Sequence, residues 1–390
     1  MNLPPQQDIS ERQWAVLEPQ LAAATARLSS HVKRATDQLL PHIDDGRATR
    51  RLNAALGQIE LDLSRAFLFF DTYMDVLTQR NSPELGAILR GCDALAMDAM
   101  RRDHPALSII EPPLVYCDRG FGASIVRESV PFPDTSPNPM PLLQIPYGRL
   151  KEKHNLTSIL HESGHQGLAR LQLVSALAET LQDALARAGA PRQIRHLYAQ
   201  WSFEIGPDFW AFALSGIAEA AAIRDLFALP SGHALRVSYH DPHPPPYLRA
   251  LLTFDWCRRA WGQGAWDDWE RQWLAAYPLD AAPTETRRVL LQARRAIPVV
   301  GQALFDTRFR VLGRRRLLDL FDLAPLAPNE LKRRASGIRS GRLDLTGLAP
   351  SVQLAVFRMV REWYPIGEAP LDRLMSDWLI RLGRNYRHAL

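Results

Sequence analysis

The segment His161-Glu162-Ser163-Gly164-His165 constrains the fold of this chain more than any other feature. Two histidines four positions apart can bind one metal ion only if the segment is helical. A helix of 3.6 residues per turn separates them by about 40° around its axis, so both imidazoles then face the same point. The glutamate between them is placed to act as a general base on a water activated by the metal. This HExxH pattern also occurs by chance, so its meaning depends on the rest of the chain.

A catalytic zinc ion usually has three protein ligands and leaves a fourth position for water. Leu168 and Leu171 stand where a metzincin would have glycine and histidine, which excludes that class of site. Glu179 follows on what reads as the same helix, roughly 21 Å from His165 along the axis, and cannot reach the ion. The third ligand must therefore come from another helix.

Glu204 can supply that ligand. It lies on the next helical stretch, which an antiparallel turn near Pro191 would carry back past the histidines. We therefore predict that His161, His165 and Glu204 bind Zn²⁺ and that Glu162 is the catalytic base.

Two further segments resemble the glutamate zincins (gluzincins), and within them the prenyl-protein endopeptidase and heat-shock-protease group. Trp201-Ser202-Phe203-Glu204-Ile205-Gly206-Pro207-Asp208 is similar to a Trp-x-x-Glu-Ile-x-x-Asp segment of bacterial members. Asp241-Pro242-His243-Pro244-Pro245-Pro246-Tyr247-Leu248-Arg249 is similar to their His-Pro…Arg segment. With the HExxH segment, the resemblance covers residues 142–250. Those relatives are embedded in membranes, so only the catalytic core can correspond.

The resemblance implies roles for the residues around the metal. Asp208 would hydrogen-bond a ligand histidine, and His243 or Arg249 would stabilise an oxyanion or orient the Glu–Asp pair. Tyr239 and Tyr247 are weaker candidates for the same task, and His240 is a possible decoy. The chain departs from the family pattern at Gly206-Pro207. Because proline removes a backbone donor and disfavours regular helix before it, we expect a kink between Glu204 and Asp208.

The fold class that we expect is mainly α (α+β), with a zincin-like core, a small β-sheet and helical flanks. Helices are predicted from residue 9 to about 104, with breaks near Pro41, Asn81-Ser82-Pro83 and His104-Pro105. Short runs of β-formers follow at 114–117, 124–126 and 142–145, and Asp118-Arg119-Gly120-Phe121-Gly122 reads as a hairpin turn between the first two. The stretch from Pro131 to Pro141 should be an irregular loop.

The remaining chain again has helical spacing. We expect one helix from Leu156 to about Arg187 with Asn155 as its N-cap, and a second over 193–229 that is interrupted or bent at Gly206-Pro207. A helix should end at Trp261, and the chain should be helical from about 300 except for a loop at 336–349. These patterns suggest a helical region 1–108, a metallopeptidase core 109–300 and a helical region 301–390.

Composition limits the partners. No segment is apolar for long enough to cross a bilayer; the run Ala66-Phe67-Leu68-Phe69-Phe70 is stopped by Asp71 and Asp75, and the first eight residues do not have the pattern of a signal peptide. Three scattered cysteines are too few for a disulfide framework, so we expect a cytoplasmic protein without a membrane span.

The chain has a net charge of +5 and two basic clusters, Arg314-Arg315-Arg316 and Lys332-Arg333-Arg334. They could contact phosphate or an acidic surface. No aromatic platform or nucleic-acid motif accompanies them, so a solvated helix face is the favoured interpretation and no nucleic-acid partner is expected.

The sequence therefore predicts a zinc-dependent peptidase that acts on a peptide or protein. Two alternatives stay open: a non-catalytic helical adaptor or regulator that retains a zincin scaffold, and a zinc hydrolase with a non-peptide substrate. The sequence does not indicate the substrate, endo- or exopeptidase action, gating by a flanking region, or the oligomeric state.

Overall fold

The computed structural model describes residues 9–39, 41, 46–120, 122–130, 137–339 and 344–387. Over these residues the chain is mainly helical with two small sheets, which confirms the predicted fold class. The first eight residues and most of the predicted loop from Pro131 to Pro141 lie outside the described residues. In the described part of the chain, no helix is long and apolar enough to cross a membrane.

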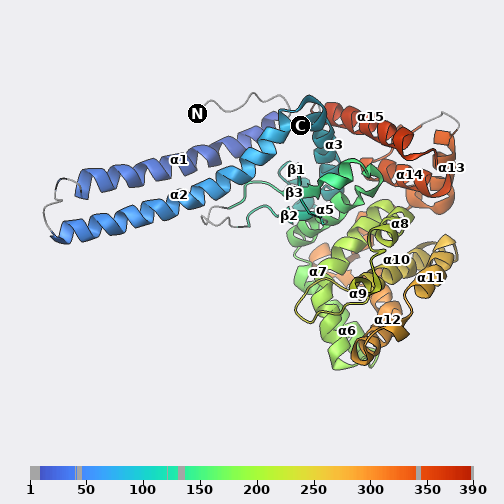
Figure 1. Cartoon of the computed structure of the whole chain (residues 1–390). Helices are drawn as coiled ribbons and strands as arrows, with labels where there is room; N and C mark the ends of the chain where they lie inside the picture. Colours follow the sequence, from blue (N-terminus) through green and yellow to red (C-terminus); the bar gives the residue numbers. More distant parts are fainter. Residues whose placement is uncertain are drawn as a thin grey trace.

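Two long helices form an arm that projects from the rest of the molecule (Figure 1). They are α1 (Glu11–Leu39) and α2 (Gly46–Arg80), and the expected break near Pro41 separates them. Only the base of the arm is anchored, because its apolar residues join residues of the sheet in a small core of their own. That core contains Ile9, Leu17, Tyr73, Val76, Leu77, Leu114, Met140 and Leu142.

The three-stranded sheet consists of β1 (Leu114–Asp118), β2 (Ser124–Val126) and β3 (Leu142–Pro146), in the order β1-β3-β2. β3 pairs in parallel with β1 and antiparallel with β2, so the predicted hairpin between the first two strands is wrong. The burial of the strands explains the order. β3 is almost wholly buried, as a central strand should be, whereas β2 is partly exposed and lies at an edge.

Helix α3 (Pro83–Met100) begins at the predicted break and packs against the C-terminal helix α15 (Glu368–Arg387). The two backbones touch at glycines. A Cβ atom on Gly91 would lie 2.2 Å from the carbonyl oxygen of Leu379, and one on Gly383 would lie 2.8 Å from the backbone nitrogen of Gly91. Any side chain at either glycine would force the helices apart. The short helix α4 (Pro105–Ser108) follows α3.

The helix expected from Leu156 to Arg187 is two helices, α5 (Thr157–Arg170) and α6 (Val174–Arg187). The chain breaks at Gln172, whose φ of 57° is left-handed and incompatible with a continuing right-handed helix. The predicted N-cap is also wrong, since α5 begins after Leu156 without a side-chain cap. The Asn155 amide instead donates to Glu152.

The following helices complete the main core. They are α7 (Arg192–Ser215), α8 (Ile217–Leu226), α9 (Ser231–Ala234), α10 (Pro246–Trp261), α11 (Ala265–Ala276), α12 (Thr284–Asp306), α13 (Pro328–Arg339) and α14 (Pro350–Trp363). The expected helix over 193–229 is divided at Gly216, which has a φ of 60°. One continuous core runs from Ile88 to Leu379, and the expected boundary after residue 300 falls inside α12.

The C-terminal part is less regular than predicted. After α12 the chain forms a small antiparallel pair, β4 (Arg308–Phe309) and β5 (Arg315–Arg316), where the sequence suggested helix. The basic clusters lie here on the surface and have acidic partners of their own. Arg316 pairs with Asp319, and Arg333 and Arg334 both pair with Glu330.

Candidate metal centre

The candidate centre is built where α5 crosses α7 in close contact. A Cβ atom on Gly164 would lie 2.9 Å from Cβ of Trp210 and 3.0 Å from Cα of Pro207. One on Gly167 would lie 2.5 Å from the Trp210 ring. The two glycines of the HExxH region thus let α7 approach α5 closely, which places acids of α7 beside histidines of α5.

The expected interruption at Gly206-Pro207 is absent, because α7 continues through both residues. Gly206 fits against α6 and the end of α5, where a Cβ atom would lie 2.8 Å from Leu168 Cδ1. Pro207 packs on α5 beside Gly164. This buried packing outweighs the cost of an interior proline, about 3 kcal/mol.

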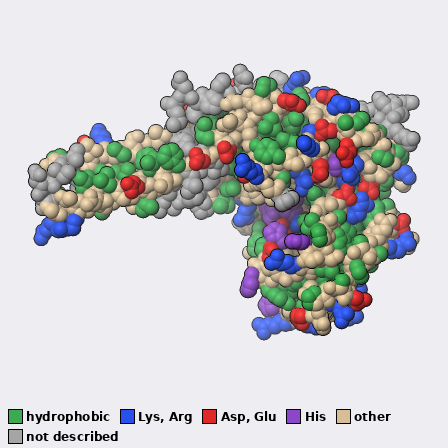
Figure 2. All heavy atoms as spheres, viewed as in Figure 1, with side chains coloured by type: hydrophobic (Ala, Val, Ile, Leu, Met, Phe, Trp, Pro, Cys, Tyr) green, Lys and Arg blue, Asp and Glu red, His purple; other side chains and the backbone are tan. Residues whose placement is uncertain are grey.

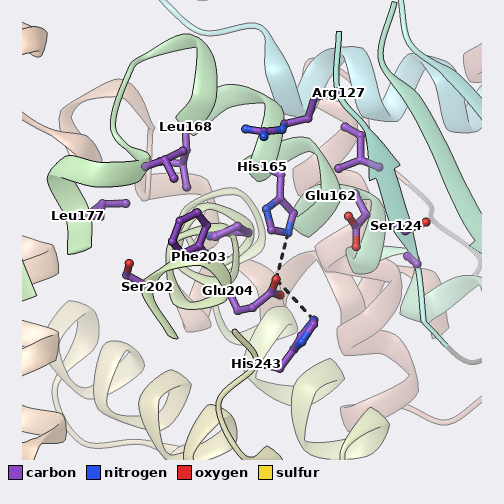
Figure 3. Close-up of a pocket in the computed structure, with 14 residues that line it drawn as sticks. Ser124, Arg127, Glu162, His165, Leu168, Leu177, Ser202, Phe203, Glu204 and His243 are labelled. Atoms are coloured by element: carbon purple, nitrogen blue, oxygen red, sulfur yellow. Dashed lines mark ion pairs between the residues drawn. The ribbon is translucent and has the colours of Figure 1, made fainter. Parts of the chain in front are cut away.

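Three side chains converge on one point. His161 Nε2 lies 3.2 Å from Glu204 Oε2. His165 Nε2 lies 3.7 Å from Glu204 Oε1, a pair that Figure 3 marks with a dashed line. One donor atom from each of the three residues can be chosen so that all lie within 4.8 Å of one another. Donors in a tetrahedral zinc site with bonds of about 2.0–2.1 Å are roughly 3.3 Å apart, so these residues fit such an ion after small movements.

A buried acid orients the first histidine. His161 Nδ1 donates to Asp208 Oδ1 at 2.8 Å, which leaves Nε2 directed toward Glu204 and the candidate ion. Arg249 donates to the same carboxylate through Nε, 2.8 Å from Oδ2, and its guanidinium also lies 4.5 Å from the centre of the Phe227 ring. Asp208 is only 1% exposed. A carboxylate that holds a ligand histidine in this way fixes its tautomer and direction.

The same contacts shift the pKa values of the site. Burial raises the pKa of Asp208, but the charge of Arg249 and the bond to His161 outweigh it and hold this pKa well below its usual range. Burial lowers the pKa of His161, yet Asp208 and Glu204 raise it to about 10. The pKa of His165 falls to about 3, mainly through burial and then through the charge of His161.

Glu162 is buried and lines a cavity next to the three donors. Burial raises its pKa to about 7; the carboxylates of Glu204 and Asp208 add to the rise, and His161 and Arg249 oppose it. A carboxyl group with a pKa near neutrality is suited to take up and release a proton at physiological pH.

His243 is held at the cavity by its own neighbour. Asp241 Oδ1 accepts from the backbone nitrogen of His243 at 3.0 Å and from its Nδ1 at 2.6 Å. His243 Nε2 then lies 3.5 Å from Glu204 Oε1, although the side chain is 56% exposed. The turn within this proline-rich connector therefore presents an imidazole to the site.

The other candidates of the connector lie outside the cavity lining. Tyr247 is fully buried and its hydroxyl accepts from Arg294, and the Tyr239 hydroxyl accepts from Gln193. His240 is exposed and does not line the cavity. Arg249 is also absent from the lining because its guanidinium is engaged with Asp208. Arg249 was considered for stabilising an oxyanion or for orienting the Glu–Asp pair, and its contacts with Asp208 match the second role.

The cavity has a volume of about 280 Å³. Figure 2 shows histidine side chains gathered at a hollow in the surface at this part of the molecule. One wall comes from the edge strand β2 and the residues beside it, the other from α5, α6 and α7. The lining residues include Ser124, Ile125, Arg127, Glu162, His165, Leu168, Val174, Leu177, Phe203, Glu204 and His243.

Three residues near the centre were not singled out from the sequence. The first is Asp241: the Asp-x-His spacing of Asp241 and His243 is typical of an Asx turn and could have revealed the role of Asp241. Arg127 directly follows β2, and nothing in its local sequence is distinctive. Glu219 of α8 is buried close to Asp208. Burial, followed by the charge of Asp208, raises its pKa to about 8, and a hydrogen bond with Thr157 opposes the rise.

Comparison of the chain with protein-family models, with curated proteins and with solved structures gives no match. The interpretation of the centre therefore depends on its geometry.

Proposed function

We propose that this protein is a zinc-dependent peptidase of the gluzincin type. The observation that carries the proposal is the convergence of His161, His165 and Glu204 at one point, with Glu162 in the adjoining cavity. The bond from His161 to Asp208 adds to this support, because a merely accidental cluster would not need an oriented imidazole.

His161, His165 and Glu204 would hold the ion. When bound, zinc would lower the pKa of a coordinated water and polarise a carbonyl group. Glu162 would accept a proton from the attacking water and pass it to the leaving amine. His243, held by Asp241 through its Nδ1–H, would in its protonated form donate from Nε2 to the developing oxyanion on the open side of the cavity. Asp208 and Arg249 would act through His161 by positioning it.

Two features favour, respectively, a peptide as the substrate and a catalytic role for the site. The edge strand β2 lines the cavity and, among the residues that the structure describes, pairs with a strand on only one side, so an extended peptide backbone could pair with its other edge. A non-catalytic scaffold would also have no need of an acid at position 162. The three cysteines are free and buried, which fits the reducing cytoplasm where we place the protein.

The test is Glu162→Gln in the full chain, after chelation and reconstitution with zinc. We expect the variant to bind zinc in the same proportion as wild type, measured by elemental analysis, and to lose hydrolysis of a broad peptide library. Glu179→Gln, at an exposed position of α6, is the matched control and should keep both properties. Full activity of Glu162→Gln would show that the base is assigned wrongly, and a wild-type protein without bound zinc would refute the metal site.

A further inference from the structure

Arg127 brings a positive charge into the candidate active site. It directly follows β2, is half-buried, and lines the same cavity as Glu162 and His165. In Figure 3 its side chain extends from the end of the strand over the cavity, on the side of His165 away from Glu204.

The acids near Arg127 are engaged elsewhere. Glu128 turns to the other side of the chain, where Arg170 Nη1 lies 3.7 Å from its Oε1 and the Gln166 amide donates to its Oε2. Glu204 faces the two histidines of α5 and His243. Among the described residues, no acid forms an ion pair or hydrogen bond with the Arg127 side chain. A guanidinium in a cavity without an acidic partner can bind an anion.

The surroundings would strengthen such an interaction. Leu168, Val174, Leu177 and Phe203 form an apolar wall of the same cavity. A bound substrate would displace water from this wall, and ion pairs gain strength where water is excluded. The planar guanidinium can also donate two parallel hydrogen bonds to a carboxylate.

We propose that Arg127 binds a carboxylate group of the peptide substrate, either the C-terminal carboxylate or the side chain of an aspartate or glutamate. This inference rests on the proposed peptidase function and adds a substrate class to it. Arg127 is a specificity residue in this scheme, since it contacts substrate away from the reacting atoms.

The test uses zinc-loaded full-length protein and peptides in matched pairs. The two members of a pair in the first set have no acidic side chain and end in a free carboxylate or in an amide. The two members of a pair in the second set both end in an amide and carry glutamate or glutamine at one position, which is varied along the peptide. We expect wild type to prefer the carboxylate member of one set, which identifies the source of the group. Arg127→Met should reduce kcat/KM for that member about tenfold or more, mainly through KM, and leave the neutral member unchanged. Arg127→Lys should retain part of the preference.

Arg119→Met is the matched control, because Arg119 is exposed and outside the cavity lining. It should behave as wild type. Equal losses of kcat/KM on the charged and neutral members of a pair, or no loss on either, would overturn the role of Arg127.

A binding measurement separates this inference from the proposed function. Zinc-loaded Glu162→Gln is titrated by calorimetry with the same peptide pairs, with and without Arg127→Met. A preference for the carboxylate member that disappears with Arg127→Met supports the inference even if wild type cleaves no peptide. If Glu162→Gln shows no preference within either set, the inference is wrong even if wild type proves to be a peptidase.

Discussion

Asp208 is a buried side chain that organises the candidate metal centre through its neighbours, since it orients His161. Its two oxygens receive hydrogen bonds from His161 and from Arg249, and both partners are cationic or become so on protonation. The charge of the acid is thereby compensated although water cannot reach it. Removing one member of such a buried group leaves another without a partner, which typically costs about 3–5 kcal/mol.

We expect Asp208→Asn to weaken zinc binding roughly 10- to 100-fold, because the amide cannot hold the His161 imidazole as a carboxylate does. The measurement is competition for zinc with a chelator of known affinity. Asp183→Asn, at an exposed position of α6, is the control and should bind zinc as wild type does. Unchanged affinity of Asp208→Asn would mean that the acid serves packing alone.

We expect the buried His154, which lies outside the candidate metal centre, to make the stability of the protein depend on pH. Burial, followed by the charges of Arg358 and Arg361, lowers its pKa to about 3; Arg149 also lowers this pKa, and Asp225 opposes the shift. The folded protein therefore keeps His154 neutral, whereas the unfolded chain takes up a proton below its ordinary pKa of about 6.5. The contribution of His154 to the free energy of unfolding is therefore fully present above pH 6.5 and is lost progressively as the pH falls toward 3.

Between pH 7 and pH 5 this residue should reduce the free energy of unfolding by about 2 kcal/mol. Urea unfolding over this range should show a shallower pH dependence for His154→Gln than for wild type. His233→Gln, at an exposed position, should keep the wild-type slope. Equal slopes for His154→Gln and wild type would show that the buried imidazole is not the source.

Sequence reasoning was most successful for residues whose relative positions follow from their spacing on a helix. His161 and His165 are neighbours on any helix, and Glu204 and Asp208 are four residues apart on another, so their convergence follows once the two helices cross. The sequence did not indicate which of His243 and Arg249 faces the cavity. It depends on how the connector folds, and there Asp241 turns the histidine toward the cavity while α10 buries the arginine.

At the scale of elements, the crossing of α5 and α7 depends on glycine at positions where helix propensity alone would favour alanine. We expect Gly167→Ala to destabilise the protein by about 1–3 kcal/mol, because the added methyl group would overlap the buried Trp210 ring. Gly57→Ala is the control in α2, where nothing lies within 4 Å of the added atom, and it should stabilise by about 0.5–1 kcal/mol. Thermal unfolding of both variants gives the comparison, and a stabilised Gly167→Ala would contradict the close crossing.

Element boundaries were the least predictable part of the fold. Apolar periodicity runs on through Gln172, and only its left-handed backbone reveals that α5 has ended. Pro207 gave the opposite error, since a residue that normally breaks helices is held in one by packing on α5. At Pro207 tertiary contacts decide the local conformation, and such contacts are not visible in a short stretch of sequence.

At the scale of the whole molecule, the arm and the body depend on each other only at the base of the arm. No described residue between 25 and 68 belongs to either hydrophobic core, and Leu56, Leu63 and Phe67 are exposed on α2.

We expect replacement of residues 25–68 by a short glycine-serine turn to leave zinc affinity and the melting temperature of the body unchanged, because the anchoring residues at the base are kept. Chelator competition and calorimetric unfolding of the shortened chain provide the measurement. A lowered zinc affinity would show that the arm supports the site from a distance.

The glycine contact between α3 and α15 has a consequence for biosynthesis. Helix α3 is synthesised well before α15, the helix that covers it, which follows all the other described elements in the chain. Until then α3 exposes an apolar face, and the body of the protein cannot close cotranslationally. A chain arranged in this way should depend on chaperones that shield nascent polypeptides.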